Sequence, residues 1–294
     1  MRKLFFISVL LSLFSSCNDG DIIVTDFNFE ASNLNYCGGP GAYIFYNINN
    51  SLFAESISLV LETSDILFLE SGTVEYVLNG MTYAVNYRKY DNDITDDYFC
   101  SNIPPTTPSV TIEFLGASGI AVLTTIVTKN DEDGIEEDST SNLDTDNDGL
   151  LNYYDNDDDG DNIPTLNELG SEFLTGNDEF PLDTDKDGIY DYLDIDDDND
   201  TILTRYEDAN ADLDPTNDFR GTNGDPDYLI ASIINSTIVD QYITHSYQLT
   251  SDIELLINNL VLVNGSEEII KETMILGNKS IVINRVITVV PDFN

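Results

Sequence analysis

Basic residues are scarce in this chain, with 11 Lys and Arg against 55 Asp and Glu in 294 residues, so the formal net charge is −44. Proteins that hold nucleic acid through its phosphates need a basic patch that releases counterions. The sequence offers no such patch, which excludes this class of partner. The acidic residues are unevenly spread, because 34 of the 55 lie between Asp131 and Asp227.

Catalytic signatures are also missing. His245 is the only histidine, and no Cys or second His can join it in a zinc-type site. The chain has no GxSxG motif for a hydrolase nucleophile. Carboxylate pairs of the glycosidase kind are not excluded by motif, but the carboxylates gather where metal coordination, described below, explains them. We therefore predict a structural role for His245 and no enzymatic activity.

Long apolar runs are absent beyond one at the N-terminus, from Leu4 to Phe14. It follows Arg2 and Lys3 and precedes Ser15, Ser16 and Cys17, the order of a secretory signal, and it is too short for an ordinary membrane-spanning helix. Plain secretion with cleavage nearby is one interpretation. The small residues before Cys17 resemble a bacterial lipoprotein signal, in which the cysteine becomes the lipidated N-terminus.

This resemblance implies residues 1–16 as signal peptide and an anchor in outer-membrane lipid through Cys17. Asp19 and Asp21 resemble the export signals of Bacteroidota surface lipoproteins, which implies exposure on the outer face of the outer membrane. The three cysteines fit an exported chain. If Cys17 carries lipid, Cys37 and Cys100 remain, and a disulfide is the default for such a pair.

An aspartate-rich phrase occurs twice, at 143–168 and again 39 residues later at 182–207. Carboxylates at alternate positions of a turning loop converge on one point, which suits Ca²⁺, and Gly149 and Gly188 stand where an EF-hand loop makes its sharp turn. The ligands predicted for these two loops are Asp144, Asp146, Asp148, Asn152 and Asp155 in the first copy and Asp183, Asp185, Asp187, Asp191 and Asp194 in the second.

A poorer loop follows in each copy, with Asn162 and Thr201 at the turn. A β-branched Thr does not easily take positive φ, so the last loop is the least secure. A third phrase from Gly224 echoes the two copies, but Phe219, Gly221 and Asn223 stand where the other loops have three acidic ligands, so it is interpreted as a decayed copy. A disordered acidic linker is the alternative for the region, although regularly spaced Gly and apolar residues argue against it. The predicted ligands of the second pair are Asp157, Asp159, Asp161, Glu168, Asp196, Asp198, Asp200 and Glu207.

The phrase resembles the thrombospondin type 3 repeat of bacterial surface proteins, in which calcium replaces a hydrophobic core. The resemblance covers about a quarter of the chain. With the lipoprotein signal and strand-rich flanks, the layout looks like a group of flavobacterial lipoproteins without an assigned function, so it implies architecture and not activity.

Strand signals dominate outside the repeats, and no helical period is convincing. They predict a mainly β protein with an immunoglobulin-like or jelly-roll β-sandwich, a central irregular calcium-binding array and a small C-terminal β-module. Asn79-Gly80 and Asn264-Gly265 are turn signals, the first being the strongest hairpin signal. The expected strands are 22–30, 42–49, 55–62, 73–79, 81–90, 110–116 and 120–128, then 241–249, 252–265, 267–276 and 279–290.

The predicted domains are residues 1–16, 17–130, 131–230 and 231–294. The sequence favours a calcium-binding cell-envelope lipoprotein in which the metal-stabilised array spaces two β-domains, with a structural or adhesion role. The alternative is a surface lipoprotein that binds a glycan or an extracellular protein and uses the array as a stalk. Glycan sites commonly stack sugars on aromatic rings, and the chain lacks Trp although it has 16 Tyr.

Overall fold

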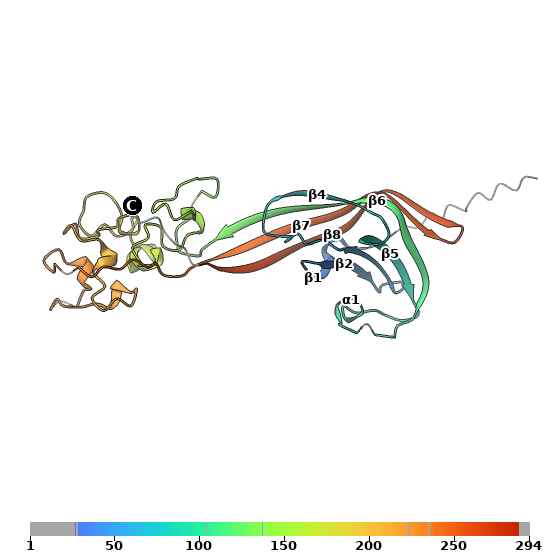
Figure 1. Cartoon of the computed structure of the whole chain (residues 1–294), viewed down its shortest axis with the longest axis horizontal. Coiled ribbons are helices and arrows are strands. Elements are labelled where there is room, and N and C mark those ends of the chain that lie inside the picture. Colours follow the sequence, from blue (N-terminus) through green and yellow to red (C-terminus); the bar gives the residue numbers. More distant parts are fainter. Residues whose placement is uncertain are drawn as a thin grey trace, which may run out of the picture. The chain divides into compact units, whose positions relative to one another are not determined.

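A computed structural model describes residues 27, 29–103, 105–136, 138–222, 224–234 and 236–287. The predicted signal peptide and Cys17 lie outside these residues. The described chain is mainly β, as predicted, and in the sequence its strands come before and after a stretch of loops and short helices (Figure 1). The strands are β1 (Asn35–Gly39), β2 (Ala42–Asn49), β3 (Glu55–Leu61), β4 (Gly72–Val77), β5 (Tyr83–Tyr90), β6 (Val110–Asn130), β7 (His245–Asn264) and β8 (Glu267–Ile287).

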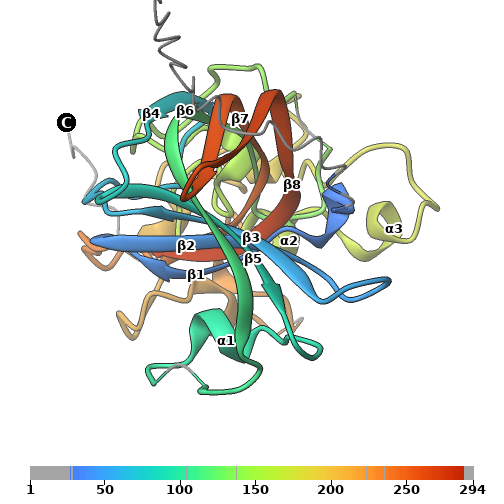
Figure 2. The same cartoon turned by 90° about the vertical axis from the view of Figure 1, so that its right-hand side faces the viewer.

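These strands form one sheet in the order β1-β2-β3-β5-β6-β7-β8, with β4 paired to β6. The pairs from β1 to β6 along this path are antiparallel, and β2, β3 and β5 run side by side in Figure 2. The C-terminal strands therefore extend the same sheet as the N-terminal ones. The predicted sandwich with a separate C-terminal module is not confirmed.

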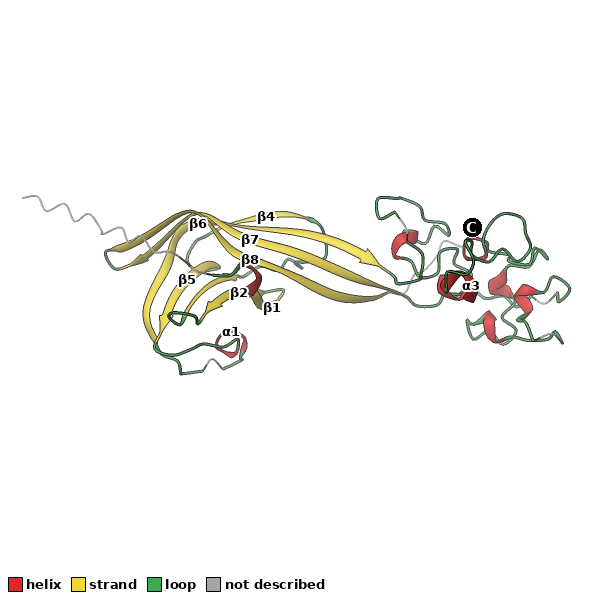
Figure 3. Ribbon diagram, turned by 180° about the vertical axis from the view of Figure 1, so that it is seen from behind, coloured by secondary structure: helices red, strands yellow, loops and turns green. Residues whose placement is uncertain are grey.

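Short helices lie between the strands, mostly in the acidic region, where Figure 3 shows loops with single helical turns. Each is only three or four residues long, as expected where no helical period is present. They are η1 (Ala31–Asn33), α1 (Asp97–Cys100), η2 (Asn152–Tyr154), α2 (Thr165–Glu168), α3 (Ser171–Leu174), η3 (Asp191–Leu193), η4 (Thr204–Tyr206), η5 (Pro215–Asn217) and η6 (Asp227–Leu229).

Three strands are longer than the sequence indicated. The segments expected at 110–116 and 120–128 are one strand, β6, and the C-terminal segments merge into β7 and β8. Gly119 and Gly277 adopt φ of 147° and 146° within β6 and β8, which lets these strands bend and continue. A Cβ at Gly277 would collide with the carbonyl oxygen of Ala31, so this position needs glycine.

The two Asn-Gly signals have different outcomes. Asn264-Gly265 joins β7 to β8, neighbours in the sheet, and Gly265 has φ of 63°. Asn79-Gly80 also forms a turn, with φ of 71° at Gly80, but it joins β4 to β5, which both pair with β6 instead of forming a hairpin with each other. The turn was predicted correctly and the pairing was not, because β6 is long enough to pair with both strands.

The core arises because the sheet curls. Asn47 on β2, which is fully buried, donates from Nδ2 to the carbonyl oxygens of Glu30 and of Leu276 on β8, both at 2.8 Å. Strands near opposite ends of the sheet order are thus joined directly. The fully buried apolar side chains enclosed there include Leu34, Phe45, Ile57, Leu59, Leu61, Leu255, Ile257, Leu260 and Leu276.

The predicted disulfide is confirmed. Cys37 on β1 and Cys100 at the end of α1 are bonded, with their Cα atoms 5.7 Å apart. The hydroxyl of Tyr46 lies 3.3 Å from Sγ of Cys100, and its ring stacks on Phe99 at 4.3 Å between centroids. The disulfide therefore attaches the proline-containing segment after β5 to the first strand.

The described chain divides into two compact units, each assembled from separate segments. The first comprises the described residues of Met1–Ile66, Val74–Leu123 and Glu254–Asn278, and the second those of Leu67–Thr73, Thr124–Ile253 and Lys279–Asn294. The division runs through β6, β7 and β8. The aspartate-rich repeats fall wholly in the second unit. Among the described residues no helix is long and apolar enough to cross a membrane.

Candidate metal centre

Each aspartate-rich loop closes with the same backbone hydrogen bond. Counting the first aspartate of a loop as position 1, the N–H of position 9 donates to the carbonyl oxygen of position 0. The same bond occurs in the third, decayed phrase, which retains the loop without the acidic ligands. The donor and acceptor pairs are Asn152 to Leu143, Thr165 to Asn156, Asp191 to Leu182, Thr204 to Ile195 and Asp227 to Asp218, at 2.9–3.0 Å.

The side chain at position 9 reinforces this closure. Asn152 accepts the backbone N–H of Thr145 at 3.1 Å, and Asp191 accepts both the backbone N–H and the hydroxyl O–H of Thr184, each at 2.7 Å. Thr165 plays the same part with the N–H of Asp158. These oxygens bind the loop's own backbone, so the structure assigns Asn152 and Asp191 a loop-closing role, while their ligation of a metal stays a prediction.

The turns require left-handed backbone at position 6. Gly149 and Gly188 both have φ of 100°, and Asn162 has φ of 77°, as the sequence indicated. Thr201 adopts φ of 82° at the same position and donates its N–H to Oδ2 of Asp196 at 3.1 Å. Because a β-branched residue is strained there, the fourth loop keeps the fold of the others at a conformational cost.

Within a loop, each central aspartate uses one oxygen to hold the turn. Oδ1 of Asp146 accepts the N–H of Asp148 at 3.0 Å, and Oδ1 of Asp148 accepts that of Leu150 at 2.6 Å. Oδ2 of each is buried and has no hydrogen-bond partner among the described residues. The turn thus leaves one oxygen per carboxylate facing the interior of the loop.

These interior oxygens converge. In the first, second and third predicted loops, the carboxylates at positions 1, 3 and 5 offer oxygens that all lie within 4.8 Å of one another. In the fourth loop, Glu207 has two buried oxygens without a partner in the described chain, and Asp198 and Asp200 have one each. The three converging sets are Asp144, Asp146 and Asp148, then Asp157, Asp159 and Asp161, then Asp183, Asp185 and Asp187.

Burying several carboxylates close together destabilises the fold unless protons or cations neutralise their charge. Asp157, Asp159 and Glu168 are at most 2% exposed, and desolvation, followed by repulsion from neighbouring carboxylates, raises the pKa of each well above its usual value. The same causes raise the pKa of Asp146 to about 7 and that of Glu207 to about 9. At neutral pH such clusters favour uptake of protons or of cations.

The donor set fits a hard divalent cation. The buried loop oxygens without a hydrogen-bond partner in the described chain are all carboxylate oxygens, which suit Ca²⁺, Mg²⁺ or Mn²⁺ better than softer metals. The converging carboxylate oxygens therefore fit a hard divalent cation, and the identity of this ion as Ca²⁺ stays a prediction.

The contact between His245 and Asp155 was not predicted from the sequence. His245 is fully buried, its Nδ1 is hydrogen-bonded to Oδ1 of Asp155, and it clusters with Asp148 and Asp155 as possible ligands. Burial lowers the pKa of His245, but the hydrogen bond and charge of Asp155 outweigh it and the pKa is raised. The structural role that we predicted fits this bond. The sequence gave no sign of the partner, which lies 90 residues away.

Two further stretches adopt the loop backbone. At 131–135 the N–H of Asp133 donates to Asp131 and that of Ile135 to Asp133, with φ of 99° at Gly134. At 208–213 the N–H of Leu213 donates to Oδ2 of Asp208, with Leu213 at φ of 71°. The Asp-x-Asp-Gly signal of the first stretch is present in the sequence, but the stretch was not among the predicted loops. The second has no glycine and gave no signal.

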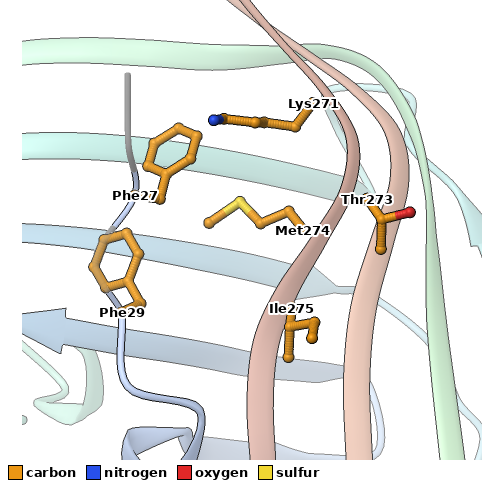
Figure 4. A pocket seen from close by; sticks show the side chains of 6 residues that line it. All are labelled: Phe27, Phe29, Lys271, Thr273, Met274 and Ile275. Atoms are coloured by element: carbon orange, nitrogen blue, oxygen red, sulfur yellow. The ribbon is translucent and has the colours of Figure 1, made fainter. Parts of the chain in front are cut away.

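A separate pocket of about 330 Å³ lies in the first unit. Figure 4 shows the rings of Phe27 and Phe29 along one side, facing Lys271 and Met274 of β8, with Thr273 and Ile275 completing the lining. The Lys271 ammonium lies 5.2 Å from the centre of the Phe27 ring. The pocket contains none of the predicted metal ligands.

No protein-family model, curated protein or solved structure matches this chain.

Proposed function

We propose that this protein is a calcium-binding lipoprotein of the cell envelope, exposed at the surface of the outer membrane, in which bound metal orders the aspartate-rich array of residues 131–230. The observation that carries the metal is the convergence of buried carboxylate oxygens that lack hydrogen-bond partners among the described residues. The envelope location rests on the signal-like N-terminus and Cys17.

Electrostatics supports an array that depends on its metal. Two carboxylates about 4 Å apart repel by roughly 1 kcal/mol at the dielectric constant of water, and by about 4 kcal/mol at the effective value near a protein surface. Each calcium ion supplies two positive charges and links residues up to position 12 of a loop. The array has little apolar core of its own, so the ions take over the role of a core.

The proposed role is structural or adhesive, because bound metal gives a defined form to the long acidic insertion between β6 and β7, which are neighbouring strands of one sheet. The affinity expected for such modules is weak, on the order of 10⁻⁴ to 10⁻³ M. Mg²⁺ should order the array poorly, since it demands octahedral geometry and keeps its water.

Calcium titration by calorimetry on the secreted chain with Cys17→Ala tests the proposal. The unmodified loops should bind several ions with a saturable calorimetric signal, while D185N/D187N should lose the ion of the third loop with both compact units still folded. Small-angle scattering in EGTA and in millimolar calcium should show a more compact particle with calcium. Superimposable scattering profiles, together with no calorimetric signal, would rule the function out.

The alternative is a glycan- or protein-binding lipoprotein with the array as a stalk. The specific observation in its favour is the pocket lined by Phe27, Phe29 and Lys271, since two rings beside an ammonium can pack against a sugar or a peptide. Saturable binding on a glycan array that is lost in F27A/F29A and unaffected by D185N/D187N would favour this function.

A further inference from the structure

Asp197 is a buried carboxylate outside the predicted ligand positions. It occupies position 2 of the fourth loop, where its N–H donates to Oγ1 of Thr204 at 3.2 Å. The side chain is only 1% exposed, and neither of its oxygens has a hydrogen-bond partner within the described chain. Loop closure therefore explains the backbone of Asp197 but not the burial of its charge.

The carboxylate of Asp197 faces the other copy of the repeat. Oxygens of Asp161, Glu168 and Asp197 all lie within 4.8 Å of one another. Asp161 and Glu168 are positions 5 and 12 of the second loop, in the first copy, and α2, which ends at Glu168, lies against η3 of the second copy. This cluster thus joins two copies that are separated by the 13-residue spacer 169–181.

The cluster carries more negative charge than its surroundings neutralise. Both oxygens of Glu168 and one of Asp161 are also buried without hydrogen-bond partners in the described chain. The guanidinium of Arg205 interacts with Asp161, but a single positive charge does not neutralise these carboxylates together with Asp157 and Asp159 of the same loop, whereas a divalent cation would add two further positive charges.

We propose that Asp197 is a ligand of the cation held by the second loop, so that one divalent ion clamps the two copies together. This inference rests on the proposed calcium function and adds to it the device that sets the position of one copy against the other. The spacer then only connects the two copies covalently, and the bound ion holds them against each other. Loss of this ion should release the copies from each other, whereas loss of the ion in the third loop should not.

The clamp predicts an unusual sign for Asp197→Asn, an isosteric change. Without metal, the variant removes one of three repelling charges, so its melting temperature in EGTA should rise above that of the unmodified chain. In saturating calcium it lacks a ligand and should melt at a lower temperature than the unmodified chain. A carboxylate with a purely structural role would give a change of the same sign in both conditions.

The test uses the secreted chain with Cys17→Ala and spin labels at N167C and I195C, exposed positions in the two copies. Pulsed dipolar spectroscopy should give a narrow distance distribution in calcium and a broad one in EGTA. With D197N the distribution should stay broad in calcium, and calorimetry should show at least about tenfold weaker binding of one ion. E168Q should reproduce this from the other copy. The matched control D187N should lose one ion and keep the narrow distribution.

The outcomes separate the two ideas. An unmodified chain that binds no calcium overturns the proposed function and the clamp together. An unmodified chain that binds calcium, with a D197N variant that keeps the narrow distribution and full stoichiometry, overturns the clamp and leaves the calcium function standing. If D197N is too unstable to label, the opposite shifts of its melting temperature in EGTA and calcium still decide, and a decrease in both conditions counts against the clamp.

Discussion

Nδ1 of His245, the first residue of β7, is hydrogen-bonded to Oδ1 of Asp155, the last ligand position of the first loop. Both side chains are buried, with at most 2% of their surface exposed. The segment just before β7 contacts the second loop, because the side chain of Asn162 is hydrogen-bonded to the backbone of Gln241 and of Ile243, at 3.1 and 3.0 Å. The histidine thus fixes the orientation of a candidate ligand from a distant part of the sequence.

Replacing His245 should show how much its hydrogen bond to Asp155 stabilises the second unit. In H245F, Asp155 stays buried without its partner, which should destabilise the second unit by roughly 3–5 kcal/mol. H245N keeps a hydrogen-bond donor near Nδ1 and should cost less. Urea denaturation in saturating calcium measures both changes. If H245F is as stable as the unmodified chain, the pair contributes nothing and the interpretation is wrong.

Thr201 in the fourth loop and Gly188 in the third loop occupy the same position, so each can be replaced by the other residue type. T201G should relieve positive φ at a β-branched residue and strengthen calcium binding by the fourth loop, by an amount on the order of 1 kcal/mol. G188T places the same strain in the third loop, where a Cβ would meet no atom within 4 Å, so the cost is conformational only. Calorimetry should show opposite changes, and changes of one sign in both variants would contradict the argument.

Acidity should weaken the effect of calcium on stability. In the metal-free chain the pKa values of Asp146 and Glu207 are raised to about 7 and about 9, above their unfolded values of about 4. The folded state therefore binds more protons, and the stability this supplies is complete below about pH 4 and is lost as pH rises through about 7 to 9. In EGTA the melting temperature should fall from pH 5 to pH 9. The increase caused by calcium should grow over that range, and a constant increase would refute this.

The disulfide should stabilise the first unit without affecting the metal. Closing a loop over 63 residues of separation corresponds to roughly 4 kcal/mol in the chain-entropy model. C37S/C100S should therefore melt at a lower temperature and bind calcium with unchanged affinity. Differential scanning calorimetry and calcium titration on the same sample check this. Alkylation of both cysteines in native, unreduced protein would show that the bond does not form.

Cys17 should carry lipid in the mature protein. We expect an acylated N-terminus at Cys17 and recovery with membranes, because small residues precede this cysteine after an apolar run. C17A should appear in soluble form. Mass spectrometry of the N-terminal peptide decides, and an unmodified N-terminus at another residue would exclude the lipoprotein.

Local chemistry explains what the sequence predicted well. β2 and β3 coincide with the expected strands within one residue, and Gly149 and Gly188 take the positive φ that their turns demand. Aspartates at alternate positions converge because they are only two residues apart on one tightly turning loop. The five-residue strand β1 was missed, since Asn35–Gly39 has little strand propensity and is paired by β2.

The local sequence by itself determined the β class of this chain, its turns and the alternate positions of its predicted ligands, because each depends on residues a few positions apart. Only the tertiary structure decided that β7 and β8 extend the sheet of β1, that β4 and β5 share β6 as a partner, and that Asp155 meets His245 and Glu168 meets Asp197. These contacts join residues far apart in sequence. They depend on how the sheet curls and how the loops pack, which no local pattern encodes.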